Sequence, residues 1–241
     1  MAETAAETVL KRKASAGRGP DGAAARTPAQ ALGIALARAA QDLFRLPVTV
    51  LASAESHGTL AELPERLAER ALLALLAGPG EGLGLAALSP EVLATLIEIQ
   101  TTHRIGPPVV ATRRPTRTDA AMAMPFIDRV LEELEAGLAR HPALVWAGGF
   151  RCGSFVDDPR PLGLLLEDTG YRMLTLSLGF GETAARTGTF FLAVPAEGRG
   201  PAPVATQRKG RTRPLPGASG AGSWNVRSWT PRCGSRRCSN G

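Results

Sequence analysis

The segment 114–138 places the strongest constraint on how this chain can fold. Its apolar residues follow one another by steps of four and three positions, and they are Ala120, Met124, Ile127, Leu131, Leu134 and Leu138. This spacing puts them on one face of an α-helix, with most charged residues on the other faces. The segment therefore predicts a long amphipathic helix that buries one face against another layer of structure.

Several residues indicate where this helix begins and ends. Thr118 is a suitable N-cap, and Asp119 would then lie in the first turn, where the helix dipole favours a carboxylate. The His141-Pro142 pair indicates a stop. Pro125 interrupts the pattern, and because a proline inside a helix costs about 3 kcal/mol, we expect a kink or a second helix start there.

The residues before this helix predict one α/β unit. Thr27 and Pro28 are typical of an N-cap and a first helical position, and a face rich in Leu and Ala follows as far as residue 46. We predict a short strand at 48–51 and a polar loop at 53–64. A second helix begins at Pro90 after a capping Ser89, ends near residue 100, and is followed by a loop over 101–117.

Two pairs of apolar runs predict β-hairpins. The first pair, 70–77 and 83–88, flanks the glycine-rich turn 78–82. Periodicity alone leaves 70–77 open between a strand and a buried helix, and the turn favours a strand. The second pair is 171–178 and 188–195. A hairpin thus follows a helix in each half of the chain, which indicates a weak internal duplication.

We expect a long irregular connection at 142–169, between the long helix and the second hairpin. The hydrophobic residues make up 44% of the chain and the aromatic ones only 5%, so the core must be aliphatic. No apolar run reaches the roughly 18 residues of a membrane span, and residues 1–19 lack the apolar region of a secretory signal. The three cysteines form no disulfide framework, so we expect a cytoplasmic location.

The net charge of +6 belongs to the end of the chain. Residues 201–241 contain eight basic and no acidic residues, so the rest carries 28 − 8 = 20 basic against 22 acidic residues. We therefore expect a flexible leader at 1–27, a folded domain at 28–197 and a disordered basic tail at 198–241. The Arg-, Gly-, Pro- and Ser-rich composition of the tail is typical of a GC-rich gene translated out of frame. A genuine tail that binds nucleic acid or a membrane is the alternative.

Motifs for catalysis are scarce in the sequence. The three histidines, at positions 57, 103 and 141, form no pair with metal-ligand spacing. Cys152 has no histidine nearby in sequence that would make it a nucleophile. The glycine-rich turn 78–82 lacks the lysine and the following helix of a phosphate-binding loop. The residues alone therefore predict no catalytic residue, no cofactor and no metal site.

Four segments together resemble the middle domain of the flagellar motor switch protein FliM, in its alphaproteobacterial form. They are the helix ending in LFRLPV, the segment LGLAALSPEVLATLIE, the helix RPTRTDAAMAMPFIDRVLEEL and the final stretch through GTFFLAVPAE. The resemblance covers residues 28–197. It implies a CheC-like α/β pseudo-repeat of helix and β-hairpin units around one sheet, with flanking helices.

The same resemblance implies a structural role in motility and chemotaxis. The family forms the wall of the C-ring, the motor switch at the cytoplasmic face of the flagellar basal body, where it contacts FliG, neighbouring FliM-type subunits and FliN. A short acidic N-terminal peptide of the family captures CheY. Here Thr8-Val9-Leu10 is followed by Lys11-Arg12-Lys13, and the FliN-docking domain is replaced by the tail, which argues against both of these contacts.

The resemblance also indicates which residues contact partners. The loop that docks FliG normally carries a Gly-Gly-x-Gly motif, and here it keeps one glycine. We predict FliG contact by Gln100, Thr101, Thr102, His103, Arg104, Ile105 and Gly106. We predict contact with neighbouring copies by the charged face of the long helix, namely Asp128, Arg129, Glu132 and Glu135.

Two other function classes are alternatives to this scaffold role. The related CheC-type phosphatases use a helical Glu-x-x-Asn pair, and this chain has no asparagine before Asn225. We therefore expect no enzymatic activity. A nucleic-acid-binding protein acting through the basic tail is the other alternative, and we expect neither a nucleic-acid partner nor membrane insertion.

Overall fold

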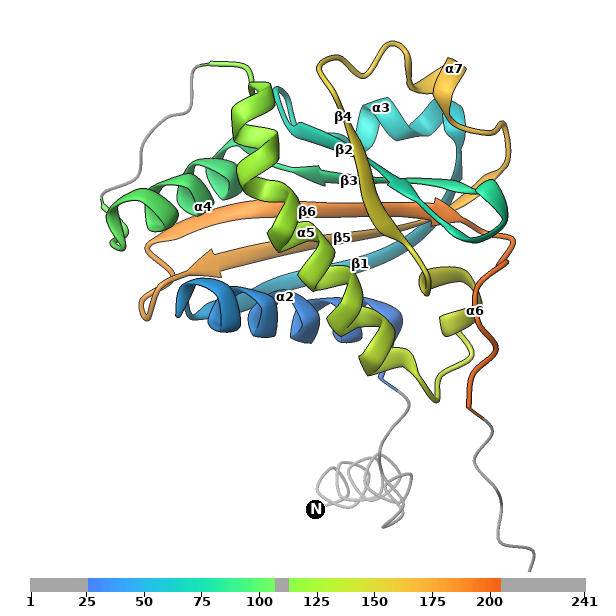
Figure 1. Ribbon diagram of the computed structural model, residues 1–241, viewed down its shortest axis with the longest axis horizontal. Coiled ribbons are helices and arrows are strands. Elements are labelled where there is room, and N and C mark those ends of the chain that lie inside the picture. The colour runs from blue at the N-terminus through green and yellow to red at the C-terminus, as the bar shows by residue number, and fades with distance from the viewer. Residues whose placement is uncertain (1–25, 107–112, 205–241) are drawn as a thin grey trace, which may run out of the picture. The chain divides into compact units, whose positions relative to one another are not determined.

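The computed structural model describes residues 26–106 and 113–204, all of which belong to one compact unit (Figure 1). The expectations for the leader before residue 26 and for the tail after residue 204 lie outside the described residues.

The first helix begins as the sequence predicts and is followed by a longer strand. Helix α2 (Pro28–Phe44) has a capping box, in which Thr27 Oγ1 accepts the N–H of Gln30 at 3.2 Å and the Gln30 side chain accepts the N–H of Thr27 at 3.1 Å. Strand β1 (Val48–Thr59) includes most of the predicted loop 53–64. That prediction was wrong because a mostly exposed strand carries no apolar alternation.

The first hairpin is confirmed. After the short helices η1 (Leu60–Glu62) and α3 (Leu63–Arg66), strands β2 (Leu72–Ala77) and β3 (Leu83–Leu88) pair around η2 (Pro79–Glu81). Helix α4 (Pro90–Thr102) follows. Its N-cap Ser89 makes no side-chain cap, because the Ser89 hydroxyl accepts the N–H of Thr189 at 3.0 Å instead.

The long central helix α5 (Arg117–Leu138) is present as one continuous helix. Its N-cap is Thr116, not the predicted Thr118: Thr116 Oγ1 accepts the N–H of Asp119 at 3.3 Å, and the Asp119 carboxylate accepts the N–H of Thr116 at 2.8 Å. Pro125 lies inside the helix and starts no second one. The predicted second start at this proline was therefore wrong.

The predicted irregular connection at 142–169 contains regular structure. It holds the short helices α6 (Leu144–Ala147) and α7 (Leu162–Leu165) and the strand β4 (Arg151–Val156), which pairs with β2. Glycine and serine within β4 gave no strand signal in the sequence. Strands β5 (Gly170–Phe180) and β6 (Arg186–Pro195) then form the second predicted hairpin.

The six strands form one sheet in the order β1-β5-β6-β3-β2-β4, and every pair is antiparallel. Each half of the unit supplies a long helix, a single strand and a hairpin. The single strand of each half pairs with the hairpin of the other, so β1 borders β5 and β4 borders β2. The expected pseudo-repeat of helix and hairpin units around one sheet is therefore confirmed.

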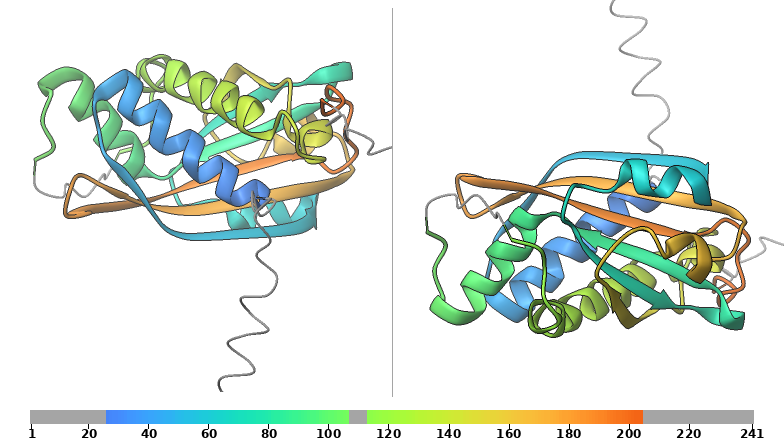
Figure 2. Two further views of the ribbon diagram at one scale, coloured as in Figure 1. Left: turned by 90° about the horizontal axis from the view of Figure 1, so that it is seen from below. Right: turned by 90° about the horizontal axis from the view of Figure 1, so that it is seen from above.

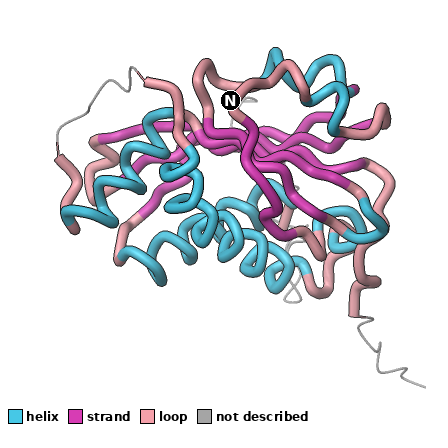
Figure 3. Tube along the Cα trace, turned by 45° about the horizontal axis from the view of Figure 1, so that its top comes forward, coloured by secondary structure: helices cyan, strands magenta, loops and turns pink. Residues whose placement is uncertain are grey.

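The sheet is covered unequally on its two faces. Helices α2, α4 and α5 gather on one face, while α3 and α7 lie on the other (Figures 2 and 3). Alternate residues of each central strand face opposite ways: Leu72 and Leu76 join the larger core under the helices, and Leu73 and Leu75 join a smaller core on the other face. Both cores are mainly aliphatic, as the composition predicts.

The packed chain continues beyond the predicted boundary at residue 197. The N–H of Gly200 donates to the carbonyl of Val145 at 2.7 Å, and that of Val204 donates to the carbonyl of Ala139 at 2.9 Å. The segment 198–204 is thus hydrogen-bonded to the α5–α6 region. None of the described helices is long and apolar enough to span a membrane.

Contact between α5 and α2 provides a test of the core. The Phe126 side chain is 1% exposed, and its ring centroid lies 6.0 Å from that of Phe44. We expect Phe126→Ala to lower the free energy of unfolding by about 3–5 kcal/mol, because it leaves a cavity in the larger core. Urea denaturation followed by circular dichroism measures this. The control Leu164→Ala removes a side chain that is 91% exposed and should change stability by less than about 0.5 kcal/mol.

Candidate functional site

The predicted FliG-contacting residues lie together where α4 ends. The last turn of α4 is held locally, since Thr101 Oγ1 donates to the carbonyl of Ile97 at 2.9 Å and Thr102 Oγ1 donates to that of Glu98 at 2.8 Å. His103 terminates the helix in the left-handed conformation, with φ of 56°. Thr102 Oγ1 also accepts the N–H of Arg104 at 3.3 Å. The first residues of the loop therefore have a defined path.

Glu98 anchors the next part of this loop. Its Oε1 accepts the N–H of Gly106 at 2.7 Å, and its Oε2 lies 2.6 Å from Nη2 of Arg186. The Arg186 side chain is 4% exposed, and its Nη1 also lies 3.5 Å from Thr95 Oγ1. A Cβ at position 106 would approach Glu98 Oε1 to 2.8 Å, so the single glycine kept in this loop allows the carboxylate to bind there. The carboxylate thus joins α4, the loop and the start of β6.

The other end of the connection is anchored at the start of α5. Asp119 accepts hydrogen bonds from both terminal nitrogens of Arg113, at 2.6 and 2.9 Å, and from the hydroxyl of Thr116 at 2.9 Å. The Asp119 side chain is 7% exposed. The Arg113 guanidinium, helped by Thr116 and opposed by burial, lowers the pKa of Asp119 to about 2.

The geometry decides which loop side chains can reach a partner. Thr101, Thr102, His103 and Arg104 are exposed, whereas Ile105 packs partly against the larger core. Gln100 points back toward α5, since its Nε2 donates to the carbonyl of Met122 at 3.1 Å. The exposed part of the predicted set is therefore centred on His103 and the positively charged Arg104 at the end of α4.

The four predicted residues of α5 do not join this site. They lie in the second half of the helix, and Asp128 is already about 16 Å along the axis from Arg117 at 1.5 Å per residue. Oδ1 of Asp128 accepts the N–H of Cys152 on β4 at 2.6 Å. Glu135 accepts the N–H of Gly149 at 3.3 Å and pairs with Arg151 at 3.2 Å.

Arg129 is likewise engaged inside the molecule. Its Nη2 lies 2.8 Å from Asp42 on α2 and 2.8 Å from Glu133, and its Nη1 lies 3.5 Å from Glu132. Helix α5 lies between α2 and β4, and its charged residues connect the two, since Arg129 and Glu133 pair with residues of α2 while Asp128 and Glu135 contact β4. Of the four residues, Glu132 is the one classed as exposed.

Sequence reasoning missed Glu98 and Arg186. Neither has a local signal, because each gains its role from a partner on another element. The only available sign was that Glu98 lies one turn before the end of α4.

The described residues show neither a metal site nor an activated thiol. Among them no group of three or more His, Cys, Asp or Glu side chains could hold a metal ion. Burial, with a smaller contribution from the Asp128 charge, raises the pKa of Cys152 to about 11, so its thiol stays protonated at neutral pH and is a poor nucleophile. The carboxylates of α5 pair with arginines and accept hydrogen bonds from main-chain N–H groups.

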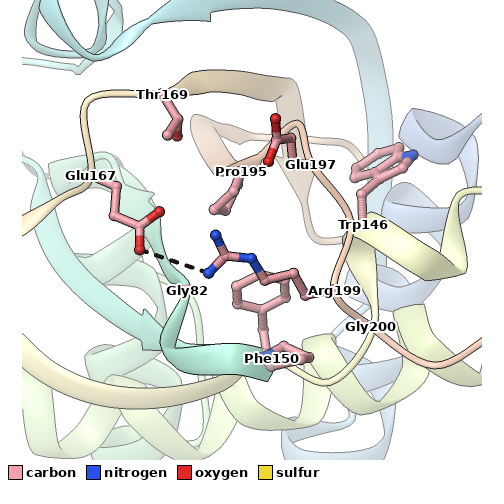
Figure 4. A pocket seen from close by; sticks show the side chains of 10 residues that line it. Gly82, Trp146, Phe150, Glu167, Thr169, Pro195, Glu197, Arg199 and Gly200 are labelled. Atoms are coloured by element: carbon pink, nitrogen blue, oxygen red, sulfur yellow. Dashed lines mark ion pairs between the residues drawn. The ribbon is translucent and has the colours of Figure 1, made fainter.

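The pocket in Figure 4 has too little free volume for a substrate. It lies between the β2–β3 turn, α6 and residues 195–200, with Trp146, Phe150 and Arg199 in its wall. Arg199 crosses it, donating to the carbonyl of Gly80 at 2.9 Å and lying 3.8 Å from Glu167. The remaining volume is about 20 Å³, room for about one water molecule.

The Glu98 anchor predicts a measurable cost when it is removed. Glu98→Ala leaves the buried Arg186 without this carboxylate, and we expect the free energy of unfolding to fall by about 2–3 kcal/mol. Urea denaturation measures the loss, and hydrogen exchange at the Gly106 amide should accelerate. Glu91→Ala, at an exposed position in the first turn of the same helix, should cost less than about 1 kcal/mol. Equal losses in the two variants would contradict the anchoring role.

Asp119 predicts a specific acid sensitivity. Because its folded pKa is lowered to about 2, it stabilises the protein fully above its unfolded pKa near 3.8, and this contribution is lost as the pH falls from about 4 toward 2. Asp119→Asn should therefore cost about 2 kcal/mol at pH 7 and much less at pH 2.5. Urea denaturation at both pH values tests this. The exposed control Asp157→Asn should show a small difference that does not depend on pH in this way.

Comparison with known proteins adds the family context of this fold. No protein-family model matches the sequence, and no curated protein matches it. Solved structures do match: a chain in the FliG–FliM complex from H. pylori has a TM-score of 0.58 with 11% identity, over 72% of this chain and 91% of that chain. A chain in the FliM–SpeE complex from H. pylori has a TM-score of 0.55 with 11% identity, over 72% and 86%.

A third similar structure contains the FliM middle domain alone. The FliM middle domain from Vibrio alginolyticus, residues 51–229 of that protein, has a TM-score of 0.51 with 12% identity, over 70% of this chain and 90% of that chain. The described unit therefore has the fold of a FliM middle domain.

Proposed function

We propose that this chain is a structural subunit of the flagellar motor switch, of the alphaproteobacterial FliM type, that binds a FliG-type protein. The observation that carries the proposal is the likeness of its fold to a chain crystallised in a FliG–FliM complex. The order of segments over residues 28–197 supports the same family. In this role the chain works by holding partners in fixed positions at the cytoplasmic face of the basal body.

The loop after α4 is the proposed FliG contact. Its position matches the docking loop that the resemblance implies, and it is exposed at His103 and Arg104 while anchored at Gly106. A loop held in one conformation loses little conformational entropy when a partner binds. The exposed histidine and arginine suit a partner surface with carboxylates.

Contact with neighbouring FliM-type subunits is a further part of the proposal. Because Asp128, Arg129 and Glu135 are engaged within the chain, they would act mainly by fixing the outer surface of α5. Glu132, the exposed member of the set, is the residue most available to a neighbouring copy.

We also propose that the chain has no phosphatase activity. A CheC-type reaction needs a carboxylate and an asparagine on one helix, and the sequence contains no asparagine before Asn225. The likeness of fold to FliM structures supports a binding role over a catalytic one.

The FliG contact can be tested by charge reversal in the loop. We expect His103→Asp combined with Arg104→Asp to weaken co-purification of the FliG-type protein of the same organism by about tenfold or more, because it replaces a histidine and a positively charged arginine by two carboxylates. Circular dichroism should show an unchanged fold. The matched control combines Ala61→Asp with Arg160→Asp, two exposed positions with the same net change of charge. Unchanged recovery of the FliG-type protein by the loop variant would refute this contact.

A further inference from the structure

The two edge strands of the sheet, β4 and β1, differ in whether other elements hydrogen bond to them. At the β4 edge, the N–H of Cys152 donates to Asp128 of α5 at 2.6 Å, and the neighbouring Gly149 and Arg151 interact with Glu135. Helix α5 thus supplies acceptors to an edge that would otherwise offer free main-chain groups. Such features protect a sheet edge from joining another strand.

The β1 edge has no such cover among the described residues. Strand β1 forms the border of the sheet beside α2 (Figure 2). It is twelve residues long, or about 40 Å. Its only main-chain partner in the sheet is β5, and no described side chain hydrogen bonds to its outer edge. A register shift lies between Val50 and Ala52, and beyond it the strand continues regularly from Ala52 to Thr59.

The side chains of β1 also favour the approach of another strand. The strand contains no proline and no lysine, which are the residues that most often block an edge. Around the centre of the regular part the side chains are small, namely Ala52, Ser53, Ala54 and Ser56. Glu55 is already paired within the chain, since it lies 3.8 Å from Nη1 of Arg172.

Apolar surface lies next to this open edge. Leu43 at the end of α2 and Val50 and Leu51 in β1 are 43%, 36% and 52% exposed. A groove of about 420 Å³ runs between α2 and β1, and most of its surface is apolar although Arg26, Gln30 and Ser53 line it together with Gly33, Ile34, Ala37 and Val50. Main-chain pairing at the edge would therefore be accompanied by burial of apolar surface beside it.

We infer that β1 pairs antiparallel with β1 of a second copy of this chain, which would make a twelve-stranded sheet with a twofold axis at its centre. A second copy fits because it brings the same small side chains, the same apolar groove and an equally open strand, as an isologous interface requires. Repulsion between two carboxylates disfavours the register in which Glu55 faces its own copy, and in the neighbouring registers Glu55 lies opposite an uncharged residue such as Leu51 or Ser53. The α2 helices of the two copies would then face one another across the axis.

The twofold symmetry requires that one residue of β1 faces the same residue of the second copy, and cross-linking can detect this. If both helix layers lie on the same face of the joined sheet, the twofold axis is perpendicular to the sheet, and one residue of β1 must lie opposite its own copy. Residues that face each other directly in antiparallel strands have Cβ atoms about 5 Å apart. A cysteine at that position would be cross-linked to its symmetry mate by a short bismaleimide.

The test uses the full-length chain with its three cysteines changed to serine. Single cysteines are placed at positions 52, 53, 54 and 56 and treated with the bismaleimide. We expect covalent dimers with a maximum at one position, and no dimer from Ser154→Cys in β4, the matched control at the other edge.

Multi-angle light scattering of the unmodified full chain should give the mass of a dimer at micromolar concentration. Val50→Glu should raise the dimer dissociation constant about tenfold or more by placing a charge in the apolar groove, while Leu164→Glu should leave it unchanged.

Each outcome decides the inference. A monomer at all concentrations, or a dimer that β1 cysteines fail to cross-link, would overturn it. Cross-linking between a β1 cysteine and Ser154→Cys, in a mixture of the two variants, would show instead a head-to-tail contact of β1 with β4. Because the cross-linking needs no disruptive substitution, the result stands even if Val50→Glu does not fold.

Discussion

The burial of α5 over the sheet is the interaction on which the rest of the structure depends. Its apolar face, including Phe126, Ile127 and Leu131, forms the centre of the larger core. Its polar residues then have defined neighbours on both sides: Arg129 reaches Asp42 of α2 at 2.8 Å, and Asp128 accepts the N–H of Cys152 of β4 at 2.6 Å. One helix thus positions the first helix, an edge strand and, through its capped N-terminus, the end of the candidate partner-binding loop.

The pseudo-repeat explains why α5 has this central position. Each half of the unit supplies a helix, a single strand and a hairpin, and the single strands are exchanged between the halves. The helices of the two halves, α2 and α5, therefore pack against each other on one face of the sheet. The equivalence is incomplete at the edges, because α5 provides carboxylates to β4 while α2 provides only an apolar groove beside β1.

The candidate site follows the same physical rule as the core, namely that buried polar groups must be satisfied. The Arg186 guanidinium, 4% exposed, is paired with Glu98, and the second oxygen of that carboxylate fixes the Gly106 N–H. A loop that is exposed at His103 and Arg104 is in this way tied to the interior. This combination of a rigid base and an exposed tip suits a scaffold that recognises a partner, and it involves no reactive group.

The sequence by itself determined the elements whose signals are local. The 3.6-residue periodicity of α5, the Thr27-Pro28 start of α2 and the glycine-rich turn of the first hairpin each depend on neighbours within a few positions, and each appears in the structure.

Tertiary structure decided the other elements and the contacts between them. Strand β4 and the second half of β1 form because their main chains pair with β2 and β5. The polar residues of these edge strands show no alternation from which a strand could be predicted. The role of Asp128 depends on Cys152, which lies 24 positions away in the sequence, and that of Glu98 depends on Arg186 at the start of the last strand. Periodicity and capping describe a segment against its immediate neighbours, whereas hydrogen bonds between distant segments form only after the chain has folded.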